Sequence, residues 1–260
     1  MTENEVPQTI IRPPLRRNLK IIVEYDGSAY QGWQNQGEKI TIQGTLEGCL
    51  QRITQENIRV SGSGRTDAGV HALNQTANFL ISRSIGVRQL LRAMNGLLPA
   101  DIVVKSIEEV PLDFHARIHA RSKNYLYRIY NSPLRPVVGR QYVWHFPHPL
   151  DLAAMEEAMG CLLGTHDFSA FCAAGSAVKD RTRTIIKTGM ERDLAGLIEI
   201  SLEATGFLRH MVRNIVGTLV EIGQGKRTAG EIPAILAGKD RRKAGRTAPA
   251  CGLFLTEVRY

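Results

Sequence analysis

The sequence predicts an α+β fold of two similar lobes, each with a mainly antiparallel sheet that is covered by helices on one face. Short segments rich in Ile, Val and aromatic residues alternate with segments whose apolar side chains recur at helical spacing. This plan occurs once in each half of the chain, although no short sequence repeat is visible. We expect an active-site cleft between the lobes, with room for a long substrate.

The chain divides into a tail and the two lobes. Residues 1–18 contain three prolines and three arginines but lack the apolar centre of a signal peptide, so we expect a flexible basic tail. The N-terminal lobe is expected at residues 19–112 and the C-terminal lobe at residues 113–260. The boundary follows Pro111, at a change from strand pattern to polar residues.

In the N-terminal lobe, residues 19–25 form the first predicted strand, which Asp26 and Gly27 end. Thr41 begins the first helix, whose apolar positions share one face. The remaining predicted elements are strands at 58–61 and 76–81, a helix at 87–97 that stops before Pro99, and a strand at 101–110.

In the C-terminal lobe, residues 124–130 form an aromatic strand. Arg192 and Asp193 are expected to connect two strands as a hairpin. The predicted elements are strands at 124–130, 183–191, 197–204 and 253–260, and helices at 151–163, 208–222 and 231–236.

Charge and cysteine usage limit the class of protein. Lys and Arg number 33 against 25 Asp and Glu, and this excess favours a polyanionic partner, either nucleic acid or an anionic membrane surface. The four cysteines are far apart and lack zinc-ligand spacing, so we expect reduced thiols in a cytoplasmic protein, with no disulfide framework and no metal. No apolar run approaches the ~20 residues that span a bilayer.

The most informative stretch is residues 61–71, where three glycines surround one carboxylate, Asp67. A phosphate-binding loop is disfavoured because Arg65 stands where the Walker motif has Lys, and because Asp67 would repel phosphate. Asp67 and His71 are too few ligands for a metal. A polar turn between strands and a carboxylate nucleophile both fit these residues.

Three further clusters fit contacts with RNA. Tyr125 and Tyr127 share one face of a strand with basic neighbours, which suits base stacking and phosphate contact. Residues 207–217 begin a helix with Arg and His, and Arg213 is placed to face Asp67 and favour its ionised form. The basic runs near residues 181–183 and 241–246 are candidate backbone contacts. Core packing and ordinary surface charge are the alternatives for each cluster.

In this order, the motifs resemble the TruA family of tRNA pseudouridine synthases over nearly the whole chain after the tail. The run Gly64-Arg65-Thr66-Asp67-Ala68-Gly69-Val70-His71 is similar to the family's catalytic motif. The other matching motifs are residues 25–27, 30–34, 113–117, 131–133, 164–168, 210–217 and 252–255. The resemblance implies isomerisation of uridine to pseudouridine at positions 38, 39 and 40 of the tRNA anticodon stem-loop. It also implies a homodimer that contacts one tRNA with both subunits, and no cofactor.

The resemblance also implies roles for individual residues. Asp67 would be the catalytic nucleophile, and attack on the base, attack on the sugar and removal of a ribose proton all remain open. Tyr125 would stack on the flipped uracil and assist the loss of its C5 proton, while Arg213 would pair with Asp67. Arg65 would fill the space of the extruded base, and Leu253 would form an apolar wall of the uracil pocket.

Two functions from other classes remain as alternatives. A non-catalytic RNA-binding module explains the charge and the aromatic residues but leaves Asp67 without a role. A hydrolase of small nucleosides would use the same carboxylate but needs no basic surface. The prediction is therefore a tRNA isomerase that flips its target uridine out of the helix.

Overall fold

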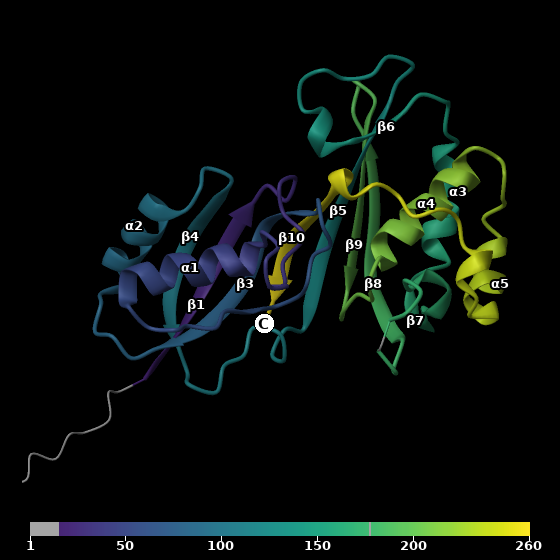
Figure 1. The fold of residues 1–260 in the computed structure, drawn as a ribbon. Helices are drawn as coiled ribbons and strands as arrows, with labels where there is room; N and C mark the ends of the chain where they lie inside the picture. The colour runs from purple at the N-terminus through teal and green to yellow at the C-terminus, as the bar shows by residue number, and fades with distance from the viewer. Residues whose placement is uncertain (1–15, 177) are drawn as a thin grey trace, which may run out of the picture.

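The computed structural model describes residues 16–176 and 178–260, and its centre is one continuous sheet of ten strands (Figure 1). The main strand order is β4-β1-β3-β10-β5-β9-β8-β7, with β2 paired to β3 and β6 paired to β5. The strands are β1 (Arg17–Tyr25), β2 (Ser61–Gly62), β3 (His71–Ile81), β4 (Ile102–Val110), β5 (Ser122–Asn131), β6 (Trp144–Phe146), β7 (Gly164–Asp167), β8 (Thr182–Arg192), β9 (Leu197–Ala204) and β10 (Leu253–Arg259). The expected tail lies outside the described residues as far as residue 15, and its last two residues already belong to β1.

Helices cover the sheet in two groups. They are α1 (Ile42–Thr54), α2 (Val87–Leu97), α3 (Leu152–Gly160), α4 (Met211–Gly223) and α5 (Glu231–Gly238). The pair α1 and α2 packs on the N-terminal half, and α3 packs against α4 on the C-terminal half, with α5 beyond them (Figure 1). Within the described parts of the chain, no helix has the length and apolar character needed to span a membrane.

The last strand joins the two halves. β10 pairs in parallel with β3 through Phe254 and His71, and antiparallel with β5 from Leu253 opposite Tyr127 onward. The predicted α+β class is confirmed, but the strands expected in two sheets form one sheet. The reason is that β10 supplies hydrogen bonds to both halves, a long-range pairing that a local sequence pattern does not contain. The proposed lobe boundary after residue 112 falls in the connection between β4 and β5, and the division into lobes stays a prediction.

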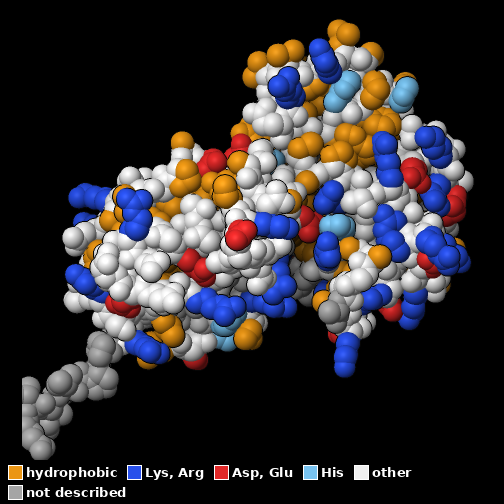
Figure 2. Space-filling view, in the orientation of Figure 1, with side chains coloured by type: hydrophobic (Ala, Val, Ile, Leu, Met, Phe, Trp, Pro, Cys, Tyr) orange, Lys and Arg blue, Asp and Glu red, His pale blue; other side chains and the backbone are white. Residues whose placement is uncertain are grey.

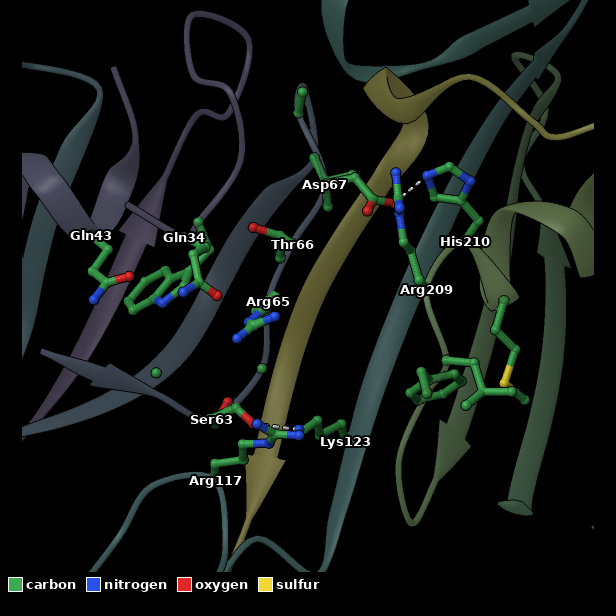
Figure 3. Close-up of a pocket in the computed structure, with 18 of the residues that line it drawn as sticks. Gln34, Gln43, Ser63, Arg65, Thr66, Asp67, Arg117, Lys123, Arg209 and His210 are labelled. Carbon is green, nitrogen blue, oxygen red and sulfur yellow. Dashed lines mark hydrogen bonds and ion pairs between the residues drawn. The ribbon is translucent and has the colours of Figure 1, made fainter. Parts of the chain in front are cut away.

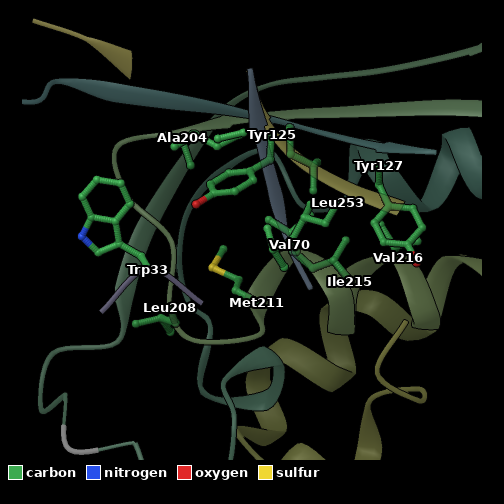
Figure 4. Packing of buried hydrophobic residues seen from close by; sticks show 14 of the residues in the cluster. Trp33, Val70, Tyr125, Tyr127, Ala204, Leu208, Met211, Ile215, Val216 and Leu253 are labelled. Atoms are coloured by element: carbon green, nitrogen blue, oxygen red, sulfur yellow. The ribbon is translucent and has the colours of Figure 1, made fainter. Parts of the chain in front are cut away.

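The apolar core continues beneath both halves and reaches the surface at the middle of the sheet. Tyr125, Tyr127 and Ile129 are buried side by side on one face of β5. Figure 4 shows Tyr125 and Leu253 beside Met211 of α4, with Val70 and Trp33 from the N-terminal half nearby. The same packing that holds the halves together therefore also forms the floor of the site described below.

Several expected elements differ in extent: β3 begins at His71 instead of residue 76, and α3 ends at Gly160 instead of residue 163. For two further elements the structure shows the cause. The strand expected at residues 58–61 is replaced by the two-residue β2, because side chains of α1 bind the backbone of Val60. The Val60 N–H donates to the Glu47 carboxylate at 3.0 Å, and its carbonyl accepts from the Gln43 amide at 3.1 Å. α4 begins three residues later than expected, because His210 adopts a left-handed φ of 61° at the N-cap.

Candidate active site

A cleft of about 1110 Å³ opens over the middle of the sheet, between α1 and the start of α4. Figure 2 shows Lys and Arg side chains on both sides of the hollow between the two halves. Among the described residues that line the cleft, Asp67 is the only carboxylate. Seven lining residues are basic: Arg59, Arg65, Arg117, Lys123, Arg183, Arg209 and Arg213. The cleft therefore combines a strongly positive lining with a single negative group.

The loop that carries Asp67 is held in place by the chain that follows β1. The Trp33 N–H donates to the Thr66 carbonyl at 3.0 Å, and the Tyr25 and Thr66 hydroxyls are hydrogen-bonded at 2.8 Å. A Cβ at Gly32 would lie only 2.6 Å from the Thr66 carbonyl oxygen, so this close approach requires glycine. The early motif at residues 25–33 thus positions the residue next to Asp67.

The end of the same loop is anchored in the core. Nδ1 of His71 accepts a hydrogen bond from the Gly27 N–H at 3.1 Å, and its ring stacks on Phe254 of β10 with centroids 4.8 Å apart. Burial lowers the pKa of His71, although Asp26 opposes this effect, so the ring is neutral at pH 7. His71 therefore anchors the end of this loop, since it links the start of β3 to Gly27 and to Phe254 of β10.

Asp67 faces two side chains from the start of α4. Its Oδ2 lies 3.4 Å from Nη1 of Arg213. The same oxygen lies 3.5 Å from Nε2 of His210 (Figure 3). Nε of Arg213 donates to the Ala248 carbonyl at 2.7 Å, which fixes the direction of the guanidinium. Both distances to Asp67 exceed the 2.7–2.9 Å typical of a charge-assisted hydrogen bond, so its oxygens keep free lone pairs. The carboxylate is 26% exposed and thus accessible from the cleft.

His210 was not among the residues expected at the site. Burial lowers the pKa of its imidazole, and the nearby charge of Arg213 acts in the same direction, while Asp67 opposes both. His210 is therefore neutral at pH 7 and contacts Asp67 as a polar neighbour. The cluster at residues 207–217 contained this histidine, but its left-handed backbone, which aims the ring at Asp67, has no sequence signal.

Tyr125 and Leu253 form the apolar floor beneath Asp67. Their side chains lie on the neighbouring strands β5 and β10, and they are 7% and 5% exposed. The ring of Tyr125 meets Phe207 edge to face, with centroids 5.0 Å apart. Burial raises the pKa of Tyr125 far above its ordinary value, and the negative charge of Asp67 adds to this, so the phenol stays protonated.

The remaining expected residues separate into two groups. Arg65 is exposed and lies beside the cleft near Thr66 (Figure 3). Tyr127 is fully buried, and its hydroxyl donates to the Pro249 carbonyl at 2.8 Å, so it belongs to the core. Of the aromatic cluster on β5, only Tyr125 lines the cleft among the described residues.

The comparison with known proteins agrees with this geometry. The sequence profile of the family described as tRNA pseudouridine synthase matches residues 21–118 and 158–260. Over 244 residues the chain is 47% identical to tRNA pseudouridine synthase A of Acetivibrio thermocellus, covering 94% of this chain and 100% of the relative. It is 45% identical over 248 residues to the protein of the same name from Geobacillus kaustophilus, covering 95% of both. The chain therefore belongs to the tRNA pseudouridine synthase family, the isomerases that convert uridine to pseudouridine in tRNA.

Proposed function

We propose that this isomerase acts on uridines at positions 38, 39 and 40 of the tRNA anticodon stem-loop, with Asp67 as its nucleophile. The observation that carries the assignment of Asp67 is that it is the only carboxylate among the described residues lining a cleft with seven basic side chains. The basic side chains suit an RNA backbone, whereas a carboxylate weakens RNA binding and so needs a chemical role. The alternative of a non-catalytic RNA-binding module gives Asp67 no such role.

The reaction rearranges bonds without a net change in composition. The bond from uracil N1 to ribose C1′ breaks, and a bond from C5 to C1′ forms; C5 loses a proton and N1 gains one. A carboxylate oxygen of Asp67 attacks the nucleoside or removes a ribose proton, and the detached uracil turns while the cleft holds it. Arg213 contacts Asp67 through Nη1 and the Ala248 carbonyl through Nε, and so it holds the carboxylate in position for this step.

The other side chains act on the base. The active site cannot reach a uridine that is stacked between its neighbouring bases in the RNA helix. The nucleotide must therefore be flipped out of the helix, at a cost of roughly a few kcal/mol. Tyr125 and Leu253 offer a nearly buried apolar surface on which the flipped uracil stacks. Because the Tyr125 phenol stays protonated, it assists the loss of the C5 proton as a relay, accepting that proton while it passes its own to water. Arg65, exposed at the edge of the cleft, occupies the gap that the base leaves in the helix.

A homodimer in the cytoplasm is the second part of the proposal. Three apolar side chains in the connection between β5 and β6 are highly exposed: Leu134, Val137 and Val138, at 79%, 75% and 93%. A second copy of the chain that covered them would remove this surface from water. Light scattering should give the mass of two chains for the wild type and of one chain for the double variant Leu134→Ser, Val138→Ser.

The cytoplasmic location is supported by the cysteines. All four are free thiols, in keeping with a reducing compartment.

The test of the chemistry is the substitution Asp67→Asn, which keeps the shape of the side chain and removes its charge. We expect the single-turnover rate of pseudouridine formation to fall at least ~10⁴-fold, as for other catalytic nucleophiles, while tRNA binding is retained. The matched control is Glu157→Gln on the exposed face of α3, which should leave both unchanged. An active Asp67→Asn protein contradicts the mechanism, and tRNA binding without pseudouridine in the wild type supports the RNA-binding module instead.

A further inference from the structure

The lower end of the cleft holds three basic side chains that the chemistry does not use. Arg117 lies in the connection between β4 and β5, Lys123 lies on β5, and Arg183 lies near the start of β8. Among the described residues, none of the three forms an ion pair with a carboxylate. Three segments far apart in the sequence thus bring positive charge together, and the Asp180 carboxylate near Arg183 forms no ion pair with it.

Lys123 ties this cluster to the loop that carries Asp67. Its Nζ donates to the Ser63 carbonyl, and Figure 3 shows Arg117 beside both residues. Ser63 precedes Asp67 by four residues, so the Cα atoms of these two residues lie within ~14 Å of each other by chain length alone. Tyr125 is two residues from Lys123 on the same face of β5, which corresponds to about 7 Å along the strand. The cluster therefore lies next to the surface on which the base is proposed to stack.

The surroundings of Lys123 lack negative charge. Burial lowers the pKa of its ammonium group to about 8, and the positive charges of Arg117 and Arg183 act in the same direction. His115 lines the same part of the cleft and offers no negative charge either.

The strands on both sides of Lys123 supply no counter-ion. Its partners are Ala204 on β9 and Val258 on β10, which are uncharged. The carboxylates adjacent to these partners, Glu203 and Glu257, both form ion pairs with Arg259. Lys123 therefore has no paired carboxylate on the neighbouring strands, and an external anion fits beside it.

We propose that Arg117, Lys123 and Arg183 bind a backbone phosphate of the RNA, next to the nucleotide that is isomerised. This inference rests on the proposed function and extends it from the base to its backbone. Guanidinium groups match phosphate oxygens in bidentate geometry, and an ammonium adds a compact point charge. Holding a phosphate here would fix the register of the strand so that the target uridine reaches Tyr125 and Asp67.

The first test measures equilibrium binding of a tRNA transcript as a function of salt, with Asp67→Asn as the background so that the RNA is not converted. Lys123→Met should weaken binding about 5-fold and reduce the slope of log K against log salt by about 1, as expected for one lost phosphate contact. Arg183→Met should act in the same direction. The matched control, Lys226→Met, lies beyond the far end of α4 and should change neither quantity. Unchanged affinity and slope in both cleft variants would overturn the proposal.

The second test uses pH. With Lys123 present, affinity should fall between pH 7 and pH 9, because the lysine loses its proton as the pH passes its lowered pKa of about 8. Lys123→Arg should keep tight binding at pH 9, whereas Lys123→Met should bind weakly at both pH values. An equal pH dependence in all three proteins contradicts the phosphate site. The proposed function is judged separately by pseudouridine formation in the wild type, and it stands or falls independently of these binding results.

Discussion

The two sides of the cleft differ in chemistry. The side formed by residues 31–43, named here the amide wall, carries five amide side chains: Gln31, Gln34, Asn35, Gln36 and Gln43. The side formed by residues 117–213, named here the cation wall, carries five basic side chains and no amide among the described lining residues: Arg117, Lys123, Arg183, Arg209 and Arg213. Asp67 lies between the two walls.

This difference assigns binding of the RNA backbone to one wall and recognition of the bases to the other. Cations attract any phosphate, so the cation wall supplies affinity and register without regard to base identity. An amide carries both a donor and an acceptor, and so it can bind the edge of a base that is exposed in an RNA loop. Gln43 is already engaged with the Asn35 N–H and with Glu47, whereas Gln34 lies at the cleft (Figure 3). Gln34 is therefore the better candidate for a contact with the RNA.

The site also requires a fixed position of the N-terminal and C-terminal halves relative to each other, because its two paired residues come from different halves. Asp67 belongs to a loop between β2 and β3, whereas its partner Arg213 belongs to α4. β10 lies between β3 and β5 and connects the two halves by backbone hydrogen bonds. A small shift between the halves would separate the carboxylate from its cation, so we expect substitutions that move the loop to affect rate more than binding.

The largest effect on the cation wall is expected at Arg213. Arg213→Met removes the ion pair with Asp67 and should lower the rate of pseudouridine formation by about 10²–10³-fold with little change in tRNA affinity. Arg213→Lys keeps the charge but lacks the forked donors that bind Ala248 and Asp67 together, so it should recover only part of the rate. Arg88→Met, on the exposed face of α2, is the control. Equal loss of binding and rate would mean that Arg213 acts on the RNA instead.

A smaller effect is expected from moving the loop on the opposite side. A Cβ at Gly27 would lie 2.0 Å from the Val70 carbonyl oxygen, so Gly27→Ala must displace the end of the loop that carries Asp67. We expect a rate at least ~10-fold lower and a free energy of unfolding lower by about 1–3 kcal/mol. Gly48→Ala is the matched control, because Gly48 is an exposed helical residue with open space around it. That change should raise stability by about 0.5–1 kcal/mol, measured by urea denaturation.

The smallest effect is expected on the amide wall. Gln34→Ala should raise the Kd for tRNA by about 3-fold through one lost hydrogen bond and leave its salt dependence unchanged. Arg209→Met on the cation wall should instead reduce the slope of log K against log salt by about 1. If both variants altered the salt dependence equally, the distinction between the two walls would be wrong.

The sequence predicted the elements of this fold better than their assembly. The strand β1 and the helix α1 are confirmed to within two residues, because their hydrophobic periodicity and the N-cap at Thr41 are local signals. The single sheet was not predicted, because it depends on β10 pairing with β3 across most of the chain. β6 and β7 were not expected, since strands of three and four residues have too little pattern to detect.

The sequence predicted those site residues that lie within recognisable sequence motifs. Asp67, Arg65, Tyr125, Arg213 and Leu253 all line one cleft, although their expected roles stay predictions. Lys123 was expected only as one of the basic neighbours of the aromatic strand, and His210 only as the histidine in residues 207–217; neither was chosen as a site residue. The burial that lowers the pKa of Lys123, and the backbone angle that aims His210, arise only when distant segments meet in the fold.

The most direct measurement is a position-resolved map of pseudouridine in unmodified tRNA transcripts after incubation with the purified protein, read by carbodiimide labelling and primer extension. The account predicts pseudouridine at positions 38, 39 and 40 with the wild type and none with Asp67→Asn. An unmodified map with the wild type, or an identical map with the substituted protein, would contradict the claim that the lone carboxylate of the cleft performs the isomerisation.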